Sequence, residues 1–253
     1  MKRFKKLVVG NWKMNPETLI EAKKIATSVK RAAKSLKRTE IVLCPPFIFL
    51  SSLLTGKSKG ISFGAQDAFY ESAGPYTGEV SSRELSGLGI DYIIIGHSER
   101  RARGESDETI NKKVKVTVGD GMTAILCIGE KERDHQGEYL HFVKKQIISG
   151  LKDVSKKSLD RVVIAYEPVW AVGAREAMPP REVQEMSIFI KKVLRDLFGV
   201  LSDGVRVLYG GDVTVGNVLE IVRDGKVSGL LIGRESLKVK NFIEIAKIAD
   251  SAK

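Results

Sequence analysis

Cysteine and histidine are scarce in this sequence of 253 residues, which contains two cysteines and three histidines. Cys44 and Cys127 each lie inside an apolar run, "IVLCPP" and "AILCIG", so we expect buried free thiols rather than a disulfide. None of the histidines belongs to a spaced Cys/His cluster. The sequence therefore gives no support for a metal site.

Long hydrophobic runs are also missing. No apolar stretch reaches the roughly 18–20 residues that a membrane helix needs. The segment "MKRFKKLVVGNWK" is basic, but its apolar run is too short for a signal peptide and it lacks a small-residue cleavage site. There is no Asn-x-Ser/Thr acceptor for glycosylation. We expect a soluble, cytoplasmic protein that does not bind membranes.

Positive charge is abundant, and the net charge of +11 suggests nucleic acid as one possible partner. However, one basic segment has apolar residues at helical spacing, which leaves its lysines and arginines on the outer face: Leu19, Ala22, Ile25, Val29, Ala33 and Leu36. No zinc-finger spacing or alternation of aromatic and basic residues occurs. We interpret the charge as a solvated surface that does not bind nucleic acid but would attract a small anionic substrate.

Eight short apolar runs recur along the chain: "KLVVGN", "IVLC", "ISFGAQ", "YIIIGH", "TAILCIG", "VVIAYE", "RVLYGG" and "GLLIG", starting at residues 6, 41, 61, 92, 123, 162, 206 and 229. Segments of helical length separate them, such as "PREVQEMSIFIKKVLRDLFG". This alternation predicts a parallel sheet covered by helices. Eight β-α repeats favour the α/β class and a closed (β/α)8 barrel, formed by residues 1–253 as a single domain.

Polar residues and glycines follow most of these predicted strands: Asn11, Lys13, Gln66, His97, Glu167, Gly210, Gly211 and Gly233. In a barrel of parallel strands the carboxyl ends converge on one face, where the following loops build the site. Residues distant in sequence should therefore surround one pocket.

Glu167, at the end of a predicted buried strand, is a candidate general base. Burial disfavours a charged carboxylate, so its affinity for protons should rise toward the range useful for proton abstraction. The alternative is a structural carboxylate paired with a nearby lysine or arginine.

His97 is the histidine that follows a predicted strand, and the sequence after it is typical of a helix start. A helix N-terminus disfavours imidazolium, so His97 could stay neutral and donate a hydrogen bond to a carbonyl oxygen. Lys13 could stabilise an anionic intermediate. Structural roles remain open for both, a satisfied histidine and an ordinary salt bridge. Together with Glu167 they suit proton transfer beside a carbonyl through an enediolate, which requires no cofactor.

Three glycine-containing stretches could bind an anion through exposed backbone N–H groups: Gly173 in "AVGAR", Gly210 and Gly211 in "YGGDV", and Gly233 in "LIGRES". Two of them follow the seventh and eighth predicted strands, where barrels often bind phosphate.

The motifs "GNWKMN", "IIIGHSERR", "CIGE", "AYEPVWAVG" and "LYGG", in this order over nearly the full chain, resemble the triosephosphate isomerase family. The segment "GPYTGEVS", residues 74–81, resembles the projecting third loop of that family. The resemblance implies a TIM barrel that interconverts dihydroxyacetone phosphate and glyceraldehyde 3-phosphate without a cofactor or metal.

The resemblance also implies roles for individual residues. Glu167 would move a proton between two substrate carbons, while the neutral His97 polarises the carbonyl group. Lys13 would balance the charge of the enediolate, and Asn11 would form hydrogen bonds with substrate oxygens.

A lid of residues 168–178 is implied as well, in which Gly173 would contact the phosphate. Ser98 would hold Glu167 when the lid is open, and Tyr209 would help to hold the lid closed. The implied lid and support residues are Ser98, Glu99, Pro168, Val169, Trp170 and Tyr209.

A homodimer is also implied, because the loop around Thr77 would enter a neighbouring subunit near Asn11 and Lys13. Glu79 and Arg100 would pair in support of that interface.

The phosphate end departs from the family pattern. Asp212 occupies a position where the family usually has serine, and Gly233 is followed by Arg234 where a second glycine is usual. The lid reads "GARE" instead of "GTGK". A carboxylate about 4 Å from a phosphate costs on the order of several kcal/mol at an effective dielectric constant near 20. We therefore predict that Asp212 and Arg234 form a compensating ion pair, with Gly173, Asp212, Gly233 and Arg234 around the phosphate.

Two other functions remain as alternatives. The altered phosphate end would also suit a non-catalytic barrel that binds sugar phosphates, although binding alone requires no base. A basic barrel acting on nucleic acid would show binding that weakens with salt.

Overall fold

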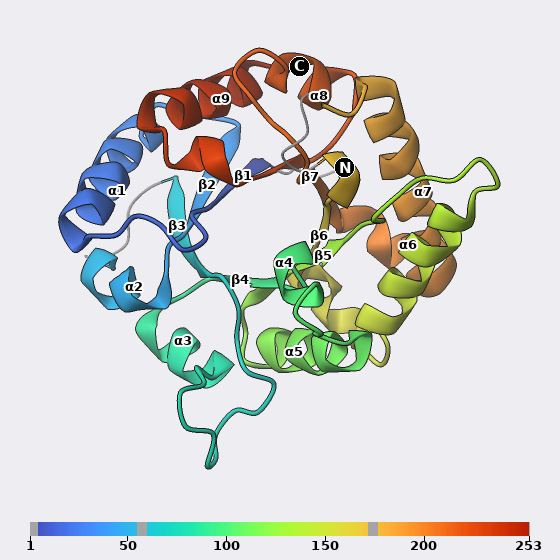
Figure 1. The fold of residues 1–253 in the computed structure, drawn as a ribbon, viewed down its shortest axis with the longest axis horizontal. Coiled ribbons are helices and arrows are strands. Elements are labelled where there is room, and N and C mark those ends of the chain that lie inside the picture. The colour runs from blue at the N-terminus through green and yellow to red at the C-terminus, as the bar shows by residue number, and fades with distance from the viewer. Residues whose placement is uncertain (1–4, 55–59, 172–176, 253) are drawn as a thin grey trace.

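Eight parallel strands form a closed barrel in sequence order, with β8 paired to β1, and helices surround it (Figure 1). The structure is a computed structural model that describes residues 5–54, 60–171 and 177–252. The strands are β1 Lys6–Asn11, β2 Thr39–Cys44, β3 Ile61–Ala65, β4 Tyr92–Ile95, β5 Thr123–Ile128, β6 Val162–Tyr166, β7 Arg206–Tyr209 and β8 Gly229–Ile232. The predicted α/β class and closed (β/α)8 barrel are confirmed, and each strand overlaps one predicted apolar run.

The helices lie outside the barrel (Figure 1). The α-helices are α1 Leu19–Ala33, α2 Phe47–Leu53, α3 Ser82–Leu88, α4 Ser98–Arg101, α5 Asp107–Gly119, α6 Glu138–Gly150, α7 Pro180–Phe198, α8 Val218–Arg223 and α9 Val239–Ser251. The 3-10 helices are η1 Lys156–Arg161, η2 Val169–Ala171, η3 Gly199–Gly204 and η4 Arg234–Ser236.

Local sequence signals fix several helix starts. The Thr18 side chain accepts a hydrogen bond from the Glu21 N–H at the start of α1. Ser81 and Glu84 form a capping box at the start of α3. Such caps satisfy backbone N–H groups that a helix leaves without partners in its first turn. The apolar face of α1 is buried as predicted, except for the partly buried Leu19, whereas Leu36 lies beyond the end of the helix and is also partly buried.

The strands bury both faces because successive side chains point to opposite sides. One cluster of buried residues comes only from strands and fills the barrel: Leu7, Val9, Val42, Cys44, Tyr92, Ile94, Ile125, Cys127, Val163, Ala165, Leu208 and Leu231. Intervening strand residues such as Val8, Ile41 and Leu43 belong to a second cluster, which includes residues of the surrounding helices. This double burial explains why the strand runs are continuously apolar.

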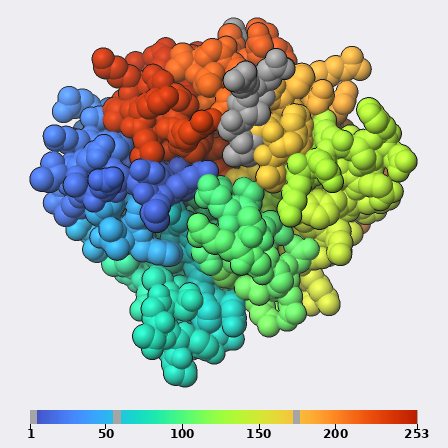
Figure 2. Space-filling model, in the orientation of Figure 1, coloured from blue at the N-terminus to red at the C-terminus, as the bar shows by residue number. Residues whose placement is uncertain are grey.

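The parallel arrangement directs every strand's carboxyl end to the same face of the barrel. The segment between β3 and α3 projects beyond the ring of helices (Figures 1 and 2). Among the described residues, no helix is both long enough and apolar enough to cross a membrane.

Candidate active site

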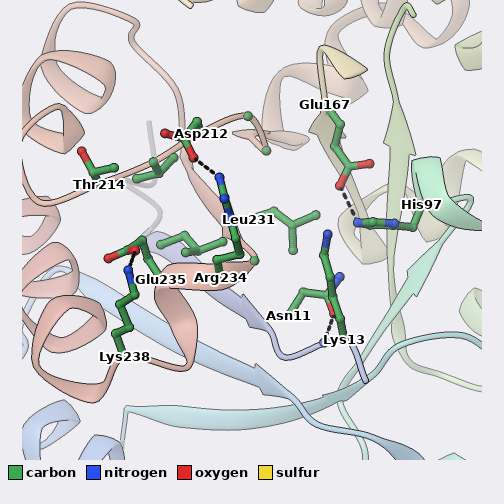
Figure 3. A pocket seen from close by; sticks show the side chains of 15 residues that line it. Asn11, Lys13, His97, Glu167, Asp212, Thr214, Leu231, Arg234, Glu235 and Lys238 are labelled. Atoms are coloured by element: carbon green, nitrogen blue, oxygen red, sulfur yellow. Dashed lines mark hydrogen bonds and ion pairs between the residues drawn. The ribbon is translucent and has the colours of Figure 1, made fainter. Parts of the chain in front are cut away.

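A cleft of about 410 Å³ opens at the carboxyl ends of the strands (Figure 3). The residues lining it are Asn11, Lys13, His97, Glu167, Gly210, Gly211, Asp212, Val213, Thr214, Leu231, Ile232, Gly233, Arg234, Glu235 and Lys238. They come from the ends of β1 and β8 and from the segments after β1, β4, β6, β7 and β8, so barrel closure brings them together.

Glu167 directly follows β6, and its carboxylate points toward the adjacent His97 on the same side of the cleft (Figure 3). The residue is 3% exposed. Its Oε1 lies 3.3 Å from His97 Nε2, and its Oε2 accepts a hydrogen bond from the Ser98 backbone N–H at 3.3 Å. A Cβ atom at Gly210 would lie 2.7 Å from Glu167 Cγ, so glycine at 210 leaves room for this carboxylate. The contacts of this carboxylate are therefore to His97 and Ser98 rather than to a lysine or arginine of the described chain.

His97 caps helix α4, and its Nδ1 accepts a hydrogen bond from the Glu99 backbone N–H at 3.2 Å. A nitrogen that accepts a hydrogen bond carries no proton, so this contact requires the neutral ring with its proton on Nε2. That N–H is directed into the cleft. The geometry thus supports the predicted neutral hydrogen-bond donor.

Lys13 has a left-handed backbone, with φ of 54°, which is uncommon for a residue other than glycine. Two contacts support this conformation: the Asn11 side chain accepts from the Lys13 N–H at 3.0 Å, and Gln66 Nε2 donates to the Lys13 carbonyl at 2.7 Å. Gln66 also donates to the Cys44 carbonyl at 2.9 Å. The loop after β1 is therefore fixed to the end of β2.

The Lys13 ammonium forms an ion pair with Glu99 at 2.6 Å. Partial burial alone would raise the pKa of the Glu99 carboxyl, but this ammonium lowers that pKa below its usual value. Both alternatives considered for Lys13 are therefore compatible with the structure, because it forms a salt bridge while lining the cleft.

Charged residues surround the opposite end of the cleft, as predicted from the sequence. Arg234 Nη2 lies 3.4 Å from Asp212 Oδ1 (Figure 3). Arg234 begins the 3-10 helix η4 and does not have a positive φ, so arginine causes no left-handed strain there. A second pair, Lys238 with Glu235 at 2.7 Å, lies beside it. Asp212 and Arg234 therefore pair as predicted, while their compensating role beside a phosphate stays a prediction.

The segment after Glu167 is anchored at its first residues. Trp170 Nε1 donates to Glu130 Oε1 at 3.0 Å, and the Val169 N–H donates to the Glu130 carbonyl at 2.9 Å. The buried Tyr209 hydroxyl lies beside the backbone of Met178 without a well-formed hydrogen bond to any described residue. Gly173, a predicted phosphate contact, lies outside the described residues.

The expected interface residues Thr77, Glu79 and Arg100 do not line this cleft. Thr77 and Glu79 are exposed in the projecting segment. Arg100 and Glu79 line the same surface hollow, but Arg100 pairs with Asp67 at 2.7 Å and with Glu105 at 3.2 Å in its own chain. Pairing between Glu79 and Arg100 across two subunits stays a prediction.

Both cysteines are buried free thiols, as predicted. Burial raises the pKa of Cys44, and burial followed by the nearby Glu167 carboxylate raises the pKa of Cys127 well above its usual range. Neither thiol is therefore available as a thiolate at neutral pH. Among the described residues, no group of three or more His, Cys, Asp or Glu side chains could hold a metal ion.

Comparison with known proteins adds to this geometry. A family model described as "Triosephosphate isomerase" matches residues 6–249. The chain belongs to the triosephosphate isomerase family. It is 38% identical over 247 residues to the triosephosphate isomerase of Endomicrobium trichonymphae, covering 96% of this chain and 98% of that protein.

Two further relatives carry the same name. The triosephosphate isomerase of Natranaerobius thermophilus is 36% identical over 245 residues, covering 96% of this chain and 95% of that protein. That of Clostridium botulinum is 38% identical over 243 residues, covering 94% and 97%. The family relationship therefore extends over almost the whole chain.

Several cleft residues of this triosephosphate isomerase family member were not predicted from its sequence. Thr214, Glu235 and Lys238 line the end of the cleft opposite Glu167, and Gln66 supports the loop carrying Lys13. Gln66 was recognisable as a polar residue at a strand end, but its role depends on two carbonyl groups from other strand ends. Lys238 follows the last strand by six residues, and nothing in its local sequence distinguishes it from the many surface lysines.

Proposed function

We propose that this protein interconverts dihydroxyacetone phosphate and D-glyceraldehyde 3-phosphate, and that Glu167, His97, Lys13 and Asn11 perform the reaction. One observation carries the assignment of residues: the buried Glu167 carboxylate lies 3.3 Å from His97 Nε2, in a cleft that also contains a lysine ammonium. Relatives named triosephosphate isomerase along the full chain support the reaction.

The proposed reaction is a proton transfer between adjacent carbons. Glu167 takes a proton from the carbon beside the substrate carbonyl, and the electron pair of the broken C–H bond forms a C=C bond. The carbonyl π electrons move to oxygen, which accepts a hydrogen bond from His97 Nε2–H. Glu167 then returns the proton to the former carbonyl carbon. The hydroxyl on the first carbon passes its proton to the enediolate oxygen through His97 Nε2 and becomes the new carbonyl, which completes the aldose–ketose isomerisation.

Lys13 and Asn11 stabilise the enediolate in this proposal. An ammonium in a cleft that excludes bulk water interacts more strongly with a developing oxyanion than it would in water. Because Asn11 and Gln66 hold the left-handed backbone of Lys13, the cation is positioned before the substrate arrives. This preorganisation reduces the cost of ordering the charge during the reaction.

Backbone N–H groups near Gly211 and Gly233, with Gly173 from the lid, are the proposed phosphate ligands, since glycine allows close approach. Arg234 would neutralise the charge of Asp212 beside the phosphate. Gly233 is close to the catalytic cation, because a Cβ atom there would lie 3.3 Å from Lys13 Cε. This proximity supports one continuous triose phosphate site.

The proposal includes a homodimer formed through the projecting segment around Thr77. Its exposure supports this proposal, as does the exposed side chain of Met14 next to Lys13. Pairing of Glu79 with Arg100 of the second subunit would belong to that interface. The glycolytic role of the family implies that the activity is cytoplasmic.

A coupled assay with glyceraldehyde 3-phosphate tests the function. Replacing Glu167→Gln removes the base while keeping the side-chain shape, so kcat should fall by roughly 10²–10⁴-fold with a much smaller change in KM.

The exposed Glu132→Gln change provides a matched control that should leave kcat unchanged. Substrate binding without turnover by the unmodified protein would instead indicate the non-catalytic sugar-phosphate-binding barrel.

A further inference from the structure

Arg101 ends the one-turn helix α4 and turns its guanidinium back toward the strands. Its Nε donates to the Gly96 carbonyl at 2.8 Å, and Nη2 donates to the Cys127 carbonyl at 3.1 Å. Nη1 forms an ion pair with Asp107 at 2.6 Å. The side chain is 17% exposed. One guanidinium thus joins the ends of β4 and β5 and the first residue of α5.

These contacts lie just beyond the last residues of β4 that pair with β5 in the sheet. The last paired residues of β4 and β5 are Ile95 and Leu126. The Gly96 and Cys127 carbonyls come directly after that pair, so Arg101 continues the connection between the two strands beyond their ladder. Gly96 has φ of 69°, a left-handed conformation that glycine adopts easily and can also leave easily. The Arg101 contact restricts that freedom.

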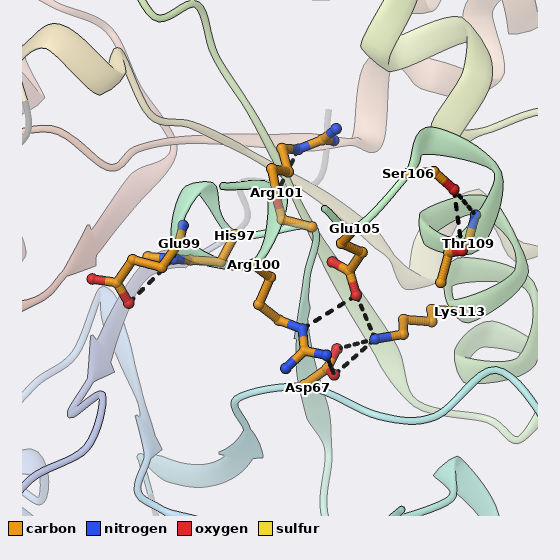
Figure 4. A network of polar contacts seen from close by, with 10 residues as sticks. Asp67, His97, Glu99, Arg100, Arg101, Glu105, Ser106, Thr109 and Lys113 are labelled. Atoms are coloured by element: carbon orange, nitrogen blue, oxygen red, sulfur yellow. Dashed lines mark hydrogen bonds and ion pairs between the residues drawn. The ribbon is translucent and has the colours of Figure 1, made fainter. Parts of the chain in front are cut away.

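Gly96 immediately precedes His97, and Arg101 binds both residues. Its side chain holds the Gly96 carbonyl, while its backbone N–H donates to the His97 carbonyl at 3.1 Å. Arg100 extends from α4 in the opposite direction, toward Asp67 (Figure 4). The short helix that follows His97 is therefore held from two sides.

We infer that Arg101 is a positioning residue that fixes the direction of the His97 Nε2–H. The inference rests on the proposed isomerase function and adds a residue that does not line the cleft. The guanidinium fork is essential to this role, because a lysine ammonium is a point charge that cannot reproduce the same set of directed contacts.

The variant Arg101→Lys tests the inference, with Arg103→Lys on the same segment as the matched exposed control. A displaced His97 should lower kcat by about 10–100-fold, because misplacement by about 1 Å costs on the order of 10²-fold in rate. KM and inhibition by inorganic phosphate should stay within about twofold, since the phosphate end is unchanged. Affinity for a phosphorylated planar enediolate mimic should fall with kcat. Arg103→Lys should match the unmodified protein in every measurement.

The 15N and proton resonances of the His97 ring provide a readout independent of turnover. They should shift in Arg101→Lys and not in Arg103→Lys. If the unmodified protein shows no turnover, the proposed function fails, whereas the ring resonances still test the positioning of His97. An unchanged kcat and unchanged His97 resonances, with only a lower melting temperature, would overturn the inference. So would a parallel loss of kcat and phosphate affinity.

A second variant covers the case in which Arg101→Lys does not fold. Asp107→Asn weakens one of the three guanidinium contacts and leaves both carbonyl contacts available. It should lower kcat by a smaller factor and shift the His97 resonances in the same direction. Values equal to those of the unmodified protein would contradict the positioning role.

Discussion

At the scale of single residues, Asp212 and Arg234 are the charged pair that the sequence predicted at the far end of the cleft. Their contact is a single N–O approach of 3.4 Å, and the Arg234 side chain is 70% exposed. Exposed ion pairs of this kind contribute roughly 0–1 kcal/mol. The Asp212–Arg234 pair therefore contributes little to stability, and its proposed role is to offset the Asp212 charge, while Glu235 has its own partners, Lys238 and Asn241.

This weak pairing predicts the behaviour of two variants. Arg234→Gly leaves the Asp212 carboxylate uncompensated beside the phosphate, so KM should rise by about 10-fold, equivalent to about 1.4 kcal/mol. The double variant Asp212→Ser/Arg234→Gly removes both charges and should show a smaller rise. Steady-state kinetics of both variants measure the difference.

Arg234→Lys retains a cation and serves as the conservative control, with KM near that of the unmodified protein. Equal increases in KM for the single and double variants would show that Asp212 and Arg234 act independently at the phosphate.

At the scale of elements, a carboxylate near the end of α9 ties that helix to the segment before β2. Asp250 accepts hydrogen bonds from the Arg38 N–H at 2.6 Å and from the Lys37 N–H at 3.1 Å. Burial alone would raise the pKa of Asp250, but these backbone donors lower that pKa below its usual value. The last helix thereby closes the structure against its second strand.

The direction of this shift gives a prediction for stability against pH. A lowered pKa means that the folded state favours ionised Asp250, so its contribution is complete above the unfolded value of about 3.9. That contribution is lost as the pH falls through the folded value. Asp250→Asn should therefore destabilise the protein at pH 7 by about 1 kcal/mol, and the difference should shrink below about pH 4.

Thermal or denaturant unfolding of both proteins across this pH range measures the effect. Glu244→Gln, an exposed change on the same helix, is the control and should show no such trend. A destabilisation by Asp250→Asn that is constant down to pH 2 would show that the ionised Asp250 carboxylate is not the source of the stabilisation.

At the scale of the whole molecule, the segment between β3 and α3 projects beyond the ring of helices and exposes part of its surface. The rings of Phe69 and Tyr76 pack within it in a tilted arrangement at a centroid distance of 4.6 Å, yet Tyr76 remains 40% exposed. Its outermost residues around Thr77 are exposed as well. A second copy of the chain is the proposed partner, with Lys13 near the contact.

Introducing a charge at Thr77 should separate the proposed dimer into monomers. Thr77→Glu would place a carboxylate in a contact from which water is excluded, and burying an unpaired charge costs several kcal/mol. Sedimentation equilibrium should show a monomer, and kcat should fall because the loop carrying Lys13 loses its neighbour. Glu71→Gln, in the same segment, should remain dimeric. A monomeric unmodified protein with full activity would contradict the proposed homodimer.

The sequence by itself determined the barrel and the identity of its central residues. Strands buried on both faces must be continuously apolar, which made all eight visible without an alignment. Because parallel strands direct their carboxyl ends to one face, Glu167, His97 and Lys13 could be assigned to a single pocket from their positions alone. The pairing of Asp212 with Arg234 could be predicted for the same reason, since each residue follows a recognisable strand.

Only the tertiary structure decided how those residues are held. The left-handed backbone of Lys13 and its support by Gln66 depend on which carbonyl groups lie nearby, 22 and 53 residues away from Gln66 in the chain. Arg101 reaches the Cys127 carbonyl across 26 residues, at a point set by the register of β4 and β5. Directed hydrogen bonds between strand ends leave no periodic pattern in the sequence, because their partners are brought together by barrel closure.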